Sequence, residues 1–338
     1  MAGTWKVAVL PGDGTGPEVM QAALDVLNAV SGRFGIRIRT TRGDAGLNCL
    51  DKYGTNMPQK TIKLLEGSDC VLKGPMTTPE GAGSEVSAAV KIRKRFELYA
   101  DVRPAKSMPG IESLRPGIDF VIVRENTEGM YSGLEFAPNR DIAIAMRVIS
   151  RKGSERVGKF ALRLANRRRK HLTIVHKGNI LKISDALFKD TIYGAARAFK
   201  GVNVDDVHVD AMAQWLIKKP ETYDVIVTEN LFGDILSDEA SMLVGGVGVG
   251  PSANIGDRYA MFEPVHGSAP KYAGMDRANP IATILSVKMM LEWMGYARAA
   301  ASVENAVIRS VADGVKTPDL GGSSSCSEVG RSVAERIR

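Results

Sequence analysis

Short apolar runs alternate with longer amphipathic stretches along most of this chain. The short runs, which are typical of buried strands, cover residues 6–10, 70–73, 172–176 and 224–228. Between them apolar residues recur at helical spacing, for example from Val19 to Val30. This alternation predicts an α/β protein with a mostly parallel sheet, and the run at 36–40 adds a strand with one solvent-facing side.

The same patterns predict several further elements. Helices are expected at residues 61–66, 153–170, 281–294 and, as the last one, about 302–313. The alternating stretch 142–149 predicts an exposed strand or hairpin, which would be a natural dimer contact. Two strand-like runs, 98–102 and 120–123, lead directly to Arg103 and Arg124. The ends of strands are where α/β proteins place ligand contacts.

The segment after the apolar run 224–228 combines helical periodicity with carboxylates. Asn230 is predicted to cap a helix on which Asp234 and Asp238, four residues apart, face the same side. Two such carboxylates can bind a hard divalent cation such as magnesium or manganese. An isolated pair at this spacing is usually a pair of solvated acids. Here the apolar and small neighbours predict a largely buried helix, on which unpaired charges would be costly.

Other polar side chains at predicted strand ends and turns offer acid–base and anion-binding chemistry. Lys177 follows a strand and would be a catalytic amine if desolvated. His266 lies in a turn that predicts a backbone-lined pocket, and Lys271 with Tyr272 offers a cation and a hydroxyl to a phosphate. Each of these residues alone is more often structural or on the surface. Together, a metal, arginines and a Lys or Tyr acid–base suit a small polyanionic substrate and decarboxylation of a β-keto acid.

The glycine-rich turn at residues 11–18 leaves two interpretations open. It follows the first strand and begins a helix, so it could bind a nucleotide. It is not G-x-G-x-x-G, and no acidic residue follows at the distance that a Rossmann ribose site needs. An ordinary strand-to-helix turn is therefore equally well supported.

Composition narrows the class of protein. The 338 residues carry a net charge of +7, and no apolar run is long enough for a transmembrane helix. The start of the chain lacks a signal-peptide pattern, and Cys49, Cys70 and Cys326 are unpaired by spacing, which predicts a reduced, cytoplasmic setting without a zinc site. The basic run 167–170 could indicate nucleic-acid binding, but a solvated helix end is the favoured interpretation, because aromatic residues are not interleaved with it.

Five motifs, in this order and spacing, resemble those of the β-decarboxylating dehydrogenases, the family of isocitrate, isopropylmalate and homoisocitrate dehydrogenases. They are PGDGTGP (11–17), LYADVRP (98–104), RENTEG (124–129), NLFGDILSD (230–238) and EPVHGSAP (263–270). The similarity covers nearly the whole chain. It implies that family's fold, in which two α/β domains flank a cleft, rather than the usual Rossmann fold. Residues 1–98 and 247–338 would form the large cofactor-binding domain, and 99–246 the small domain, with a dimer clasp at about 131–150.

The resemblance also implies roles for single residues. Arg93, Arg103 and Arg124 would clamp the substrate carboxylates. Asp234 and Asp238, with Asp210 of the neighbouring subunit, would hold magnesium or manganese. Lys177 of the neighbour would take part in deprotonating the alcohol, the metal would stabilise the enolate left by loss of carbon dioxide, and Tyr131 would protonate that enolate. The active unit would then be at least a homodimer, and a catalytically silent regulatory subunit is the rival that the presence of all these residues opposes.

Substrate choice in this family lies in the segment 84–93. Ser87 aligns with the serine that isocitrate enzymes use for the γ-carboxylate, and Asn179 would be a further substrate contact. Ala89 and Val90 lie in the segment where isopropylmalate enzymes have a leucine-rich pattern. Homoisocitrate enzymes often have an extra arginine near the position of Val90. The resemblance therefore favours isocitrate as substrate, with 3-isopropylmalate or homoisocitrate as alternatives.

Cofactor choice lies at Lys271 and Tyr272. NAD-dependent relatives have an Asp at the first position, whereas Lys-Tyr resembles the NADP-dependent bacterial isocitrate enzymes, so NADP is expected to be preferred over NAD. Pro318 and Gly322 stand where those enzymes have a Tyr and an Arg. The full set of implied cofactor contacts is Lys73, Thr77, Glu263, His266, Gly267, Lys271, Tyr272, Asn279 and Asp319.

Overall fold

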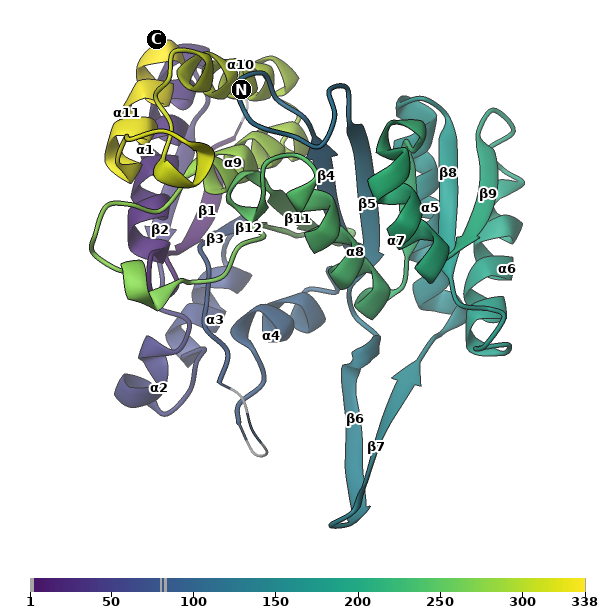
Figure 1. Ribbon diagram of the computed structural model, residues 1–338. Coiled ribbons are helices and arrows are strands. Elements are labelled where there is room, and N and C mark those ends of the chain that lie inside the picture. The colour runs from purple at the N-terminus through teal and green to yellow at the C-terminus, as the bar shows by residue number, and fades with distance from the viewer. Residues whose placement is uncertain (1–2, 80, 82–83, 338) are drawn as a thin grey trace.

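A ten-stranded mixed sheet runs through the whole protein (Figure 1). The computed structural model describes residues 3–79, 81 and 84–337. The strands lie in the order β2-β1-β3-β12-β11-β4-β5-β10-β8-β9. In chain order they are β1 (Trp5–Leu10), β2 (Ile38–Arg42), β3 (Cys70–Lys73), β4 (Ala100–Lys106), β5 (Asp119–Glu125), β8 (His171–His176), β9 (Asn203–His208), β10 (Val225–Thr228), β11 (Pro251–Ile255) and β12 (Ala260–Pro264).

The two ends of the sheet are parallel, whereas its centre is antiparallel. β12 pairs with β11, β11 with β4 and β4 with β5 in antiparallel fashion, and the other pairs are parallel. The predicted α/β class with a mostly parallel sheet is confirmed, although apolar runs alone do not encode strand direction. Arg103 was predicted at the end of a strand, and that is wrong: it lies within β4, opposite Ile122 of β5.

Eleven α-helices among the described residues cover the sheet. They are α1 (Gly16–Phe34), α2 (Asn48–Tyr53), α3 (Gln59–Glu66), α4 (Ala88–Arg95), α5 (Arg151–Arg167), α6 (Ser184–Ala196), α7 (Val209–Lys218), α8 (Asn230–Met242), α9 (Ile281–Trp293), α10 (Ala297–Ala312) and α11 (Cys326–Ile337). The helices predicted at 61–66, 153–170 and 281–294 are confirmed, with shifted ends, as α3, α5 and α9.

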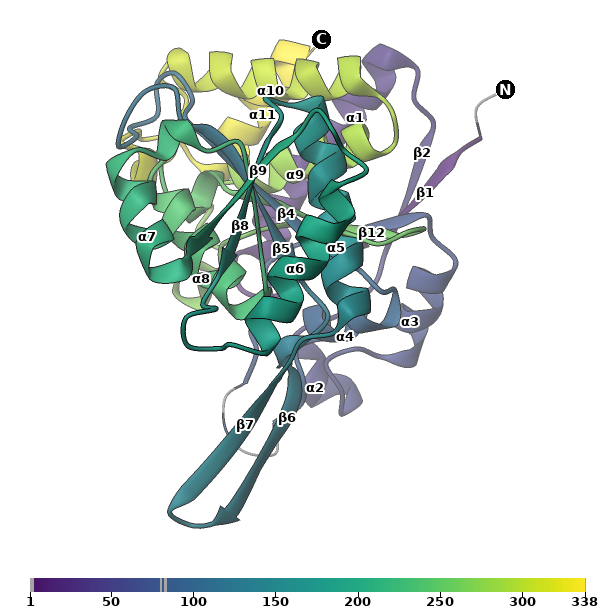
Figure 2. The same cartoon turned by 90° about the vertical axis from the view of Figure 1, so that its right-hand side faces the viewer.

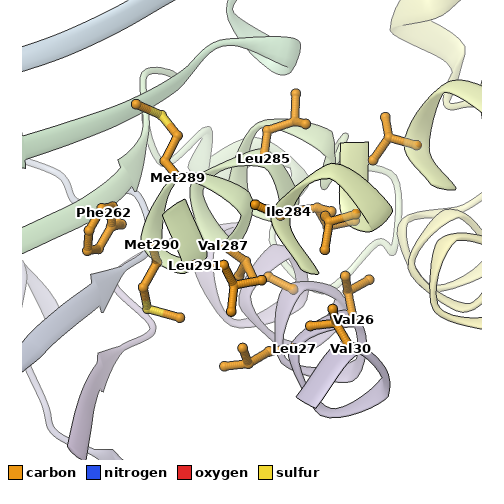
Figure 3. Close-up of a cluster of buried hydrophobic side chains, with 14 of the residues drawn as sticks. Val26, Leu27, Val30, Phe262, Ile284, Leu285, Val287, Met289, Met290 and Leu291 are labelled. Carbon is orange, nitrogen blue, oxygen red and sulfur yellow. The ribbon is translucent and has the colours of Figure 1, made fainter. Parts of the chain in front are cut away.

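Both faces of the sheet are buried because successive strand residues point in opposite directions. On β1, Val9 packs with α1 and α9, whereas the next residue, Leu10, packs against α3 and α4 on the other face. On β10, Val227 faces α5 and α6, and Ile226 faces α7 and α8. The largest apolar cluster joins α1 to α9, as Figure 3 shows for Val26 and Ile284.

The final helix of the chain was predicted wrongly. The helix expected at about 302–313 is α10, which begins earlier, and α11 follows it. α11 presents Val329 and Val333 to the core at helical spacing, and its Gly330 lies so close to α1 that an added Cβ would be 2.6 Å from the Cβ of Ala22. The serine-rich stretch before α11 hid its start in the sequence.

β6 (Gly129–Asn139) and β7 (Ile142–Val148) form a separate hairpin that projects from the body of the protein (Figures 1 and 2). The predicted exposed hairpin is therefore confirmed. Large apolar side chains of the hairpin are exposed, namely Leu134, Phe136, Ile142, Ile144, Met146 and Val148. A contiguous apolar surface of this kind is typical of a protein–protein contact.

Candidate active site

The start of helix α8 places the two carboxylates predicted to bind metal. The helix is capped by Glu229, whose side chain accepts a hydrogen bond from the backbone N of Phe232 at 2.8 Å. The prediction that Asn230 is the cap is wrong by one residue. The amide oxygen of Asn230 is instead used by Arg124, which donates to it from Nε at 2.9 Å and from Nη2 at 2.6 Å.

A cavity of about 440 Å³ lies beside α8 and brings together most of the predicted substrate residues. Its walls come from the segment after β3, from α4, from the neighbouring strands β4 and β5, and from the base of the hairpin. The predicted site residues that line it are Lys73, Ser87, Arg93, Arg103, Arg124, Tyr131, Asp234, Glu263, His266 and Gly267. Ala89 and Val90 form part of the same wall.

Asp234 is held by three of these side chains. Arg103 Nη2 lies 3.3 Å from its Oδ1, Arg124 Nη1 pairs with the same oxygen, and the Tyr131 hydroxyl donates to Oδ2. Burial would raise the pKa of the Asp234 carboxyl, but Arg124 and Arg103 outweigh burial and lower it. Burial and the contact with Asp234 raise the pKa of the Tyr131 phenol, so this hydroxyl keeps its proton at neutral pH.

Asp238 is less enclosed than Asp234. Its Oδ1 lies 3.3 Å from Arg103 Nη1, and its side chain is 60% exposed, against 32% for Asp234. Burial raises the pKa of the Asp238 carboxyl, and Arg103 offsets this only in part. Asp234 therefore lines the cavity, and Asp238, one helical turn further on, is linked to it through Arg103; both offer oxygens suited to a hard cation.

Asp101 is a functional residue that sequence reasoning missed. It is fully buried, accepts a hydrogen bond from Arg103 Nε at 2.9 Å, and lies 3.7 Å from Arg124 Nη1. Ser252 Oγ donates to its other oxygen at 2.5 Å. A charged residue inside the otherwise apolar run 98–102, two residues before an arginine, is the signal that could have revealed it. Asp101 fixes the direction of both arginines.

A buried ion triad forms another part of the cavity wall. Glu263 Oε2 lies 2.7 Å from Lys73 Nζ, and its Oε1 lies 3.0 Å from Arg93 Nη2. Asn254 donates to Oε1 as well, at 2.8 Å. Burial would raise the pKa of the Glu263 carboxyl, but the two cations dominate and lower it far below its ordinary value. Lys73 and Glu263 were predicted as cofactor contacts, and the structure shows them engaged with each other.

Replacing Glu263 by glutamine should cost roughly 3 kcal/mol of unfolding free energy at neutral pH, because two buried cations lose their counter-charge. The lowered pKa means that this stabilisation is complete above the ordinary value of 4.5 and is lost as the pH falls through the folded-state value. Urea unfolding of both proteins at neutral pH and in acid measures this. Glu66→Gln, in a half-exposed pair with Arg95, is the matched control and should change stability by less than about 1 kcal/mol.

Lys177, Asn179 and Asp210 do not line the cavity that contains Asp234. Lys177 Nζ lies 2.6 Å from Asp210 Oδ1, and Asp210 is the second residue of α7. Asn179 is exposed on the loop after β8. Within the part of the chain that the structure describes, no three His, Cys, Asp or Glu side chains gather as a metal site. The described residues thus bring together two of the three carboxylates predicted to bind metal, Asp234 and Asp238, through their shared contact with Arg103.

A second cavity, of about 590 Å³, adjoins the first through His266 and Gly267, which line both. Tyr272, Asn279 and Asp319 of the predicted cofactor set line it too. Thr15 of the glycine-rich turn also faces it, which supports the ligand interpretation of that turn. Thr77 lies nearby in the fold, with its hydroxyl 2.6 Å from that of Ser268.

Two features of the second cavity fit a nicotinamide nucleotide. The Nε2 of His266 is buried without a hydrogen-bond partner, and burial lowers the pKa of this imidazole, so a neutral ring nitrogen is left for a ligand. Backbone can approach closely at Gly248, where an added Cβ would lie 2.9 Å from Asp319 Oδ2 and 3.1 Å from Asn279 Nδ2. Both features suit a polar, extended ligand.

The sequence predicted Lys271 as the cation of this cavity, but a different cation lines it. Lys271 is exposed and does not line the cavity; its Nζ lies over the Tyr272 ring, 4.8 Å from the centroid. Arg277 does line the cavity, and among the described residues its guanidinium has no hydrogen bond or ion pair. A single arginine in a loop carries no distinguishing pattern, so sequence reasoning did not single it out.

Comparison with known proteins agrees with this geometry. Residues 6–333 match the family model described as isocitrate/isopropylmalate dehydrogenase. The chain belongs to the isocitrate/isopropylmalate dehydrogenase family. It is 44% identical over 340 residues to the 3-isopropylmalate/3-methylmalate dehydrogenase of Methanocaldococcus jannaschii, covering 98% of this chain and 99% of the relative. It is 46% identical over 336 residues to the isocitrate/homoisocitrate dehydrogenase of Thermus thermophilus, covering 99% of each.

The fold also matches a solved member of the family. The crystal structure of isocitrate dehydrogenase from Methylococcus capsulatus superposes with a TM-score of 0.94 at 40% sequence identity, and covers 99% of this chain and all of that one. The predicted family and fold are therefore confirmed. The protein is a metal-dependent decarboxylating dehydrogenase of the isocitrate/isopropylmalate dehydrogenase family.

Three further features lie outside the site. The basic run 167–170 is only partly solvated as predicted, because Arg168 donates to Asp224 and to Asp119, at 2.8 Å each. The charge of Arg168 is thereby neutralised within the fold. Cys49, Cys70 and Cys326 are free and buried, as their spacing predicted. Every helix of the described residues is too short or too polar to cross a membrane.

Proposed function

We propose that this protein oxidatively decarboxylates a malate substituted at C3, with 3-isopropylmalate as the first candidate substrate. The observation that carries this proposal is one cavity in which Arg93, Arg103 and Arg124 stand near an uncharged wall of Ala89 and Val90. Arginines suit the two carboxylates of the malate core, and the small apolar wall suits an alkyl group. The 3-isopropylmalate enzymes among the relatives favour this substrate over the isocitrate expected from the sequence.

The charges of the cavity support this choice. Lys73 and Arg93 share the carboxylate of Glu263, and Lys91, the next cation along α4, is turned toward Glu85 and Asn56. Among the described residues, each of these three cations therefore already has a carboxylate partner before a third substrate carboxylate could reach the wall of Ala89 and Val90. A large alkyl group needs no such partner.

Isocitrate is the second candidate because of Ser87. Its side chain lines the same cavity, and a hydroxyl there can donate to a γ-carboxylate. The same argument applies to homoisocitrate, whose third carboxylate is carried on a longer side chain.

The roles of the chain's own residues follow from their protonation and contacts. A divalent cation bound at Asp234 and Asp238 would supply Lewis-acid stabilisation of developing negative charge. Arg103 and Arg124 would exchange part of their contact with Asp234 for the substrate carboxylates, which orients the malate core. Tyr131 holds a proton at Oη, and Lys177 of a second subunit would take the proton of the substrate alcohol. A bound nicotinamide would supply the hydride acceptor.

Initial rates of nicotinamide reduction with magnesium or manganese test the proposal, across 3-isopropylmalate, isocitrate, homoisocitrate and malate. We expect the highest kcat/KM with 3-isopropylmalate. Ser87→Ala should leave that value within about threefold but lower kcat/KM for isocitrate about tenfold, the worth of one hydrogen bond to a charged group. A higher kcat/KM for isocitrate in the unmodified protein would reject the substrate assignment, and inactivity on every acid would favour a silent regulatory subunit.

We further propose NADP as the preferred cofactor, supported by the cations Lys271 and Arg277 beside the second cavity. Lys271→Asp should lower the ratio of kcat/KM for NADP to that for NAD by about tenfold or more, because an acid repels a 2′-phosphate and accepts ribose hydroxyls. Lys63→Asp, at an exposed position of α3, is the control for net charge. An unchanged ratio in Lys271→Asp would overturn this assignment.

The proposed active unit is a homodimer. The exposed apolar residues of the hairpin continue on exposed faces nearby, with Ile180 and Ile183 after β8 and Ile235 and Met242 on α8. A second copy of the chain seated there would bury this surface and bring its Lys177 and Asp210 to Asp234 and Asp238. The division into domains, 1–98 with 247–338 and 99–246, and the cytoplasmic location remain predictions.

A further inference from the structure

Arg147 lies near the end of β7, where the hairpin joins the body of the protein. Its guanidinium stands between two carboxylates that belong to different elements. Nη1 donates to Asp185 Oδ1 at 2.5 Å and to Ser184 Oγ at 3.2 Å, both at the start of α6. On the other side, Nε lies 3.4 Å from Glu229 Oε2, and the group covers the Phe232 ring at 5.1 Å.

Asp185 connects Arg147 to the proposed catalytic amine. Its second oxygen, Oδ2, accepts a hydrogen bond from the backbone N of Lys177 at 2.5 Å. This fixes the start of the loop after β8 from which Lys177 extends toward Asp210. The carboxylate of Asp185 is only 1% exposed, so water does not compete for it.

Glu229 connects Arg147 to the proposed metal ligands. Its Oε1 caps α8 at Phe232, and α8 carries Asp234 and Asp238 on its next turns. Glu229 is as deeply buried as Asp185, with a side chain 2% exposed. A planar guanidinium can contact carboxylates on two sides at once, whereas the compact ammonium group of a lysine would contact only one of them here.

We propose that Arg147 is a positioning residue that couples the two active sites of the homodimer. This rests on the proposed function, in which α8 serves the site of its own chain and Lys177 serves the partner's site. One Arg147 therefore sets Asp234 in one site and Lys177 in the other. Loss of its charge leaves two buried carboxylates without a counter-charge and releases both connections.

Mixed dimers test the coupling. Wild-type and Arg147→Met chains carrying different affinity tags are co-expressed, and the mixed dimers are purified. The Arg147→Met homodimer should lose activity on the order of 10- to 100-fold, as for other residues that orient metal ligands. In the mixed dimer both sites contain one loosened part, so its kcat should fall well below the mean of the two homodimers. A kcat equal to that mean overturns the coupling, because it shows one unimpaired site.

A titration with Mn²⁺, followed by electron paramagnetic resonance without substrate, gives a readout that does not depend on turnover. Mixed dimers should contain no site of wild-type affinity, because the Lys177 that Asp185 holds pairs with Asp210, the third proposed metal ligand. One such site per dimer contradicts the proposal. Arg147→Lys keeps the charge and should restore thermal stability without restoring kcat, whereas full recovery of both would contradict the two-sided role. Arg151→Met, an exposed arginine four residues on, is the matched control and should behave as wild type. Activity of the unmodified protein tests the proposed function separately.

Discussion

Two inactive variants should restore each other's activity when they form mixed dimers. Lys177→Ala removes the proposed base and Asp234→Asn a proposed metal ligand, so each homodimer should lose on the order of 10²- to 10⁴-fold in kcat. In a dimer that contains one chain of each kind, one site combines an intact Asp234 with the intact Lys177 of the other chain. That dimer should recover about half of the wild-type activity.

The reciprocal pairing sharpens this test. A wild-type chain combined with a chain that carries both substitutions contains no complete shared site and should be nearly inactive. If each site were built from a single chain, the outcomes would be exchanged: the first dimer would be inactive and the second would keep half. Tagged co-purification, sedimentation to confirm dimers and initial rates distinguish the two arrangements.

Tyr131→Phe should lower kcat by about 10²- to 10⁴-fold while the KM for the hydroxy acid changes little. The phenol is protonated at neutral pH because burial and Asp234 raise its pKa, so it is available as an acid. Phenylalanine keeps the ring under the Arg124 guanidinium, 4.9 Å from its centroid, and removes only the hydroxyl. Binding and folding should therefore be preserved.

Rapid mixing locates the impaired step. With excess cofactor, the Tyr131→Phe protein should still show a fast first reduction of the nicotinamide, followed by slow release of the protonated product. Tyr53→Phe removes a similar hydroxyl at the surface, where it donates to Asp44, and should leave kcat unchanged. A kcat of Tyr131→Phe within a few-fold of wild type would show that another group supplies the proton.

The sequence predicted those parts of the fold and site that depend on local pattern. Val225 to Thr228 alternate between two buried faces, and an uninterrupted apolar run is the signature of that environment. The carboxylates of α8 were found because their helical spacing is local too. The antiparallel centre of the sheet was not, since β11 and β12 are buried like the parallel strands, and only tertiary pairing sets their direction.

What the sequence could not show are partners that meet from distant segments. The role of Asp101 depends on its contacts with Arg124 and Ser252. The role of Arg147 depends on its contacts with Asp185 and Glu229. Each of these contacts joins residues far apart along the chain. Asparagine is a common capping residue, which is why the sequence predicts Asn230 as the cap. In the structure Arg124 binds its amide oxygen, and Glu229 accepts the capping hydrogen bond from Phe232 instead.

The pairing of β11 with β4 would limit how the two proposed domains can move relative to each other. There the proposed large and small domains would share one sheet, joined by three residue pairs, Ala253 with Val102, Asn254 with Asp101 and Ile255 with Ala100. Any closure between them would have to twist this hydrogen-bonded ladder, since no flexible linker separates the paired strands. Asp101, which contacts Arg103 and Arg124, is one of the paired residues, so such a twist would also turn the arginines proposed to bind the substrate.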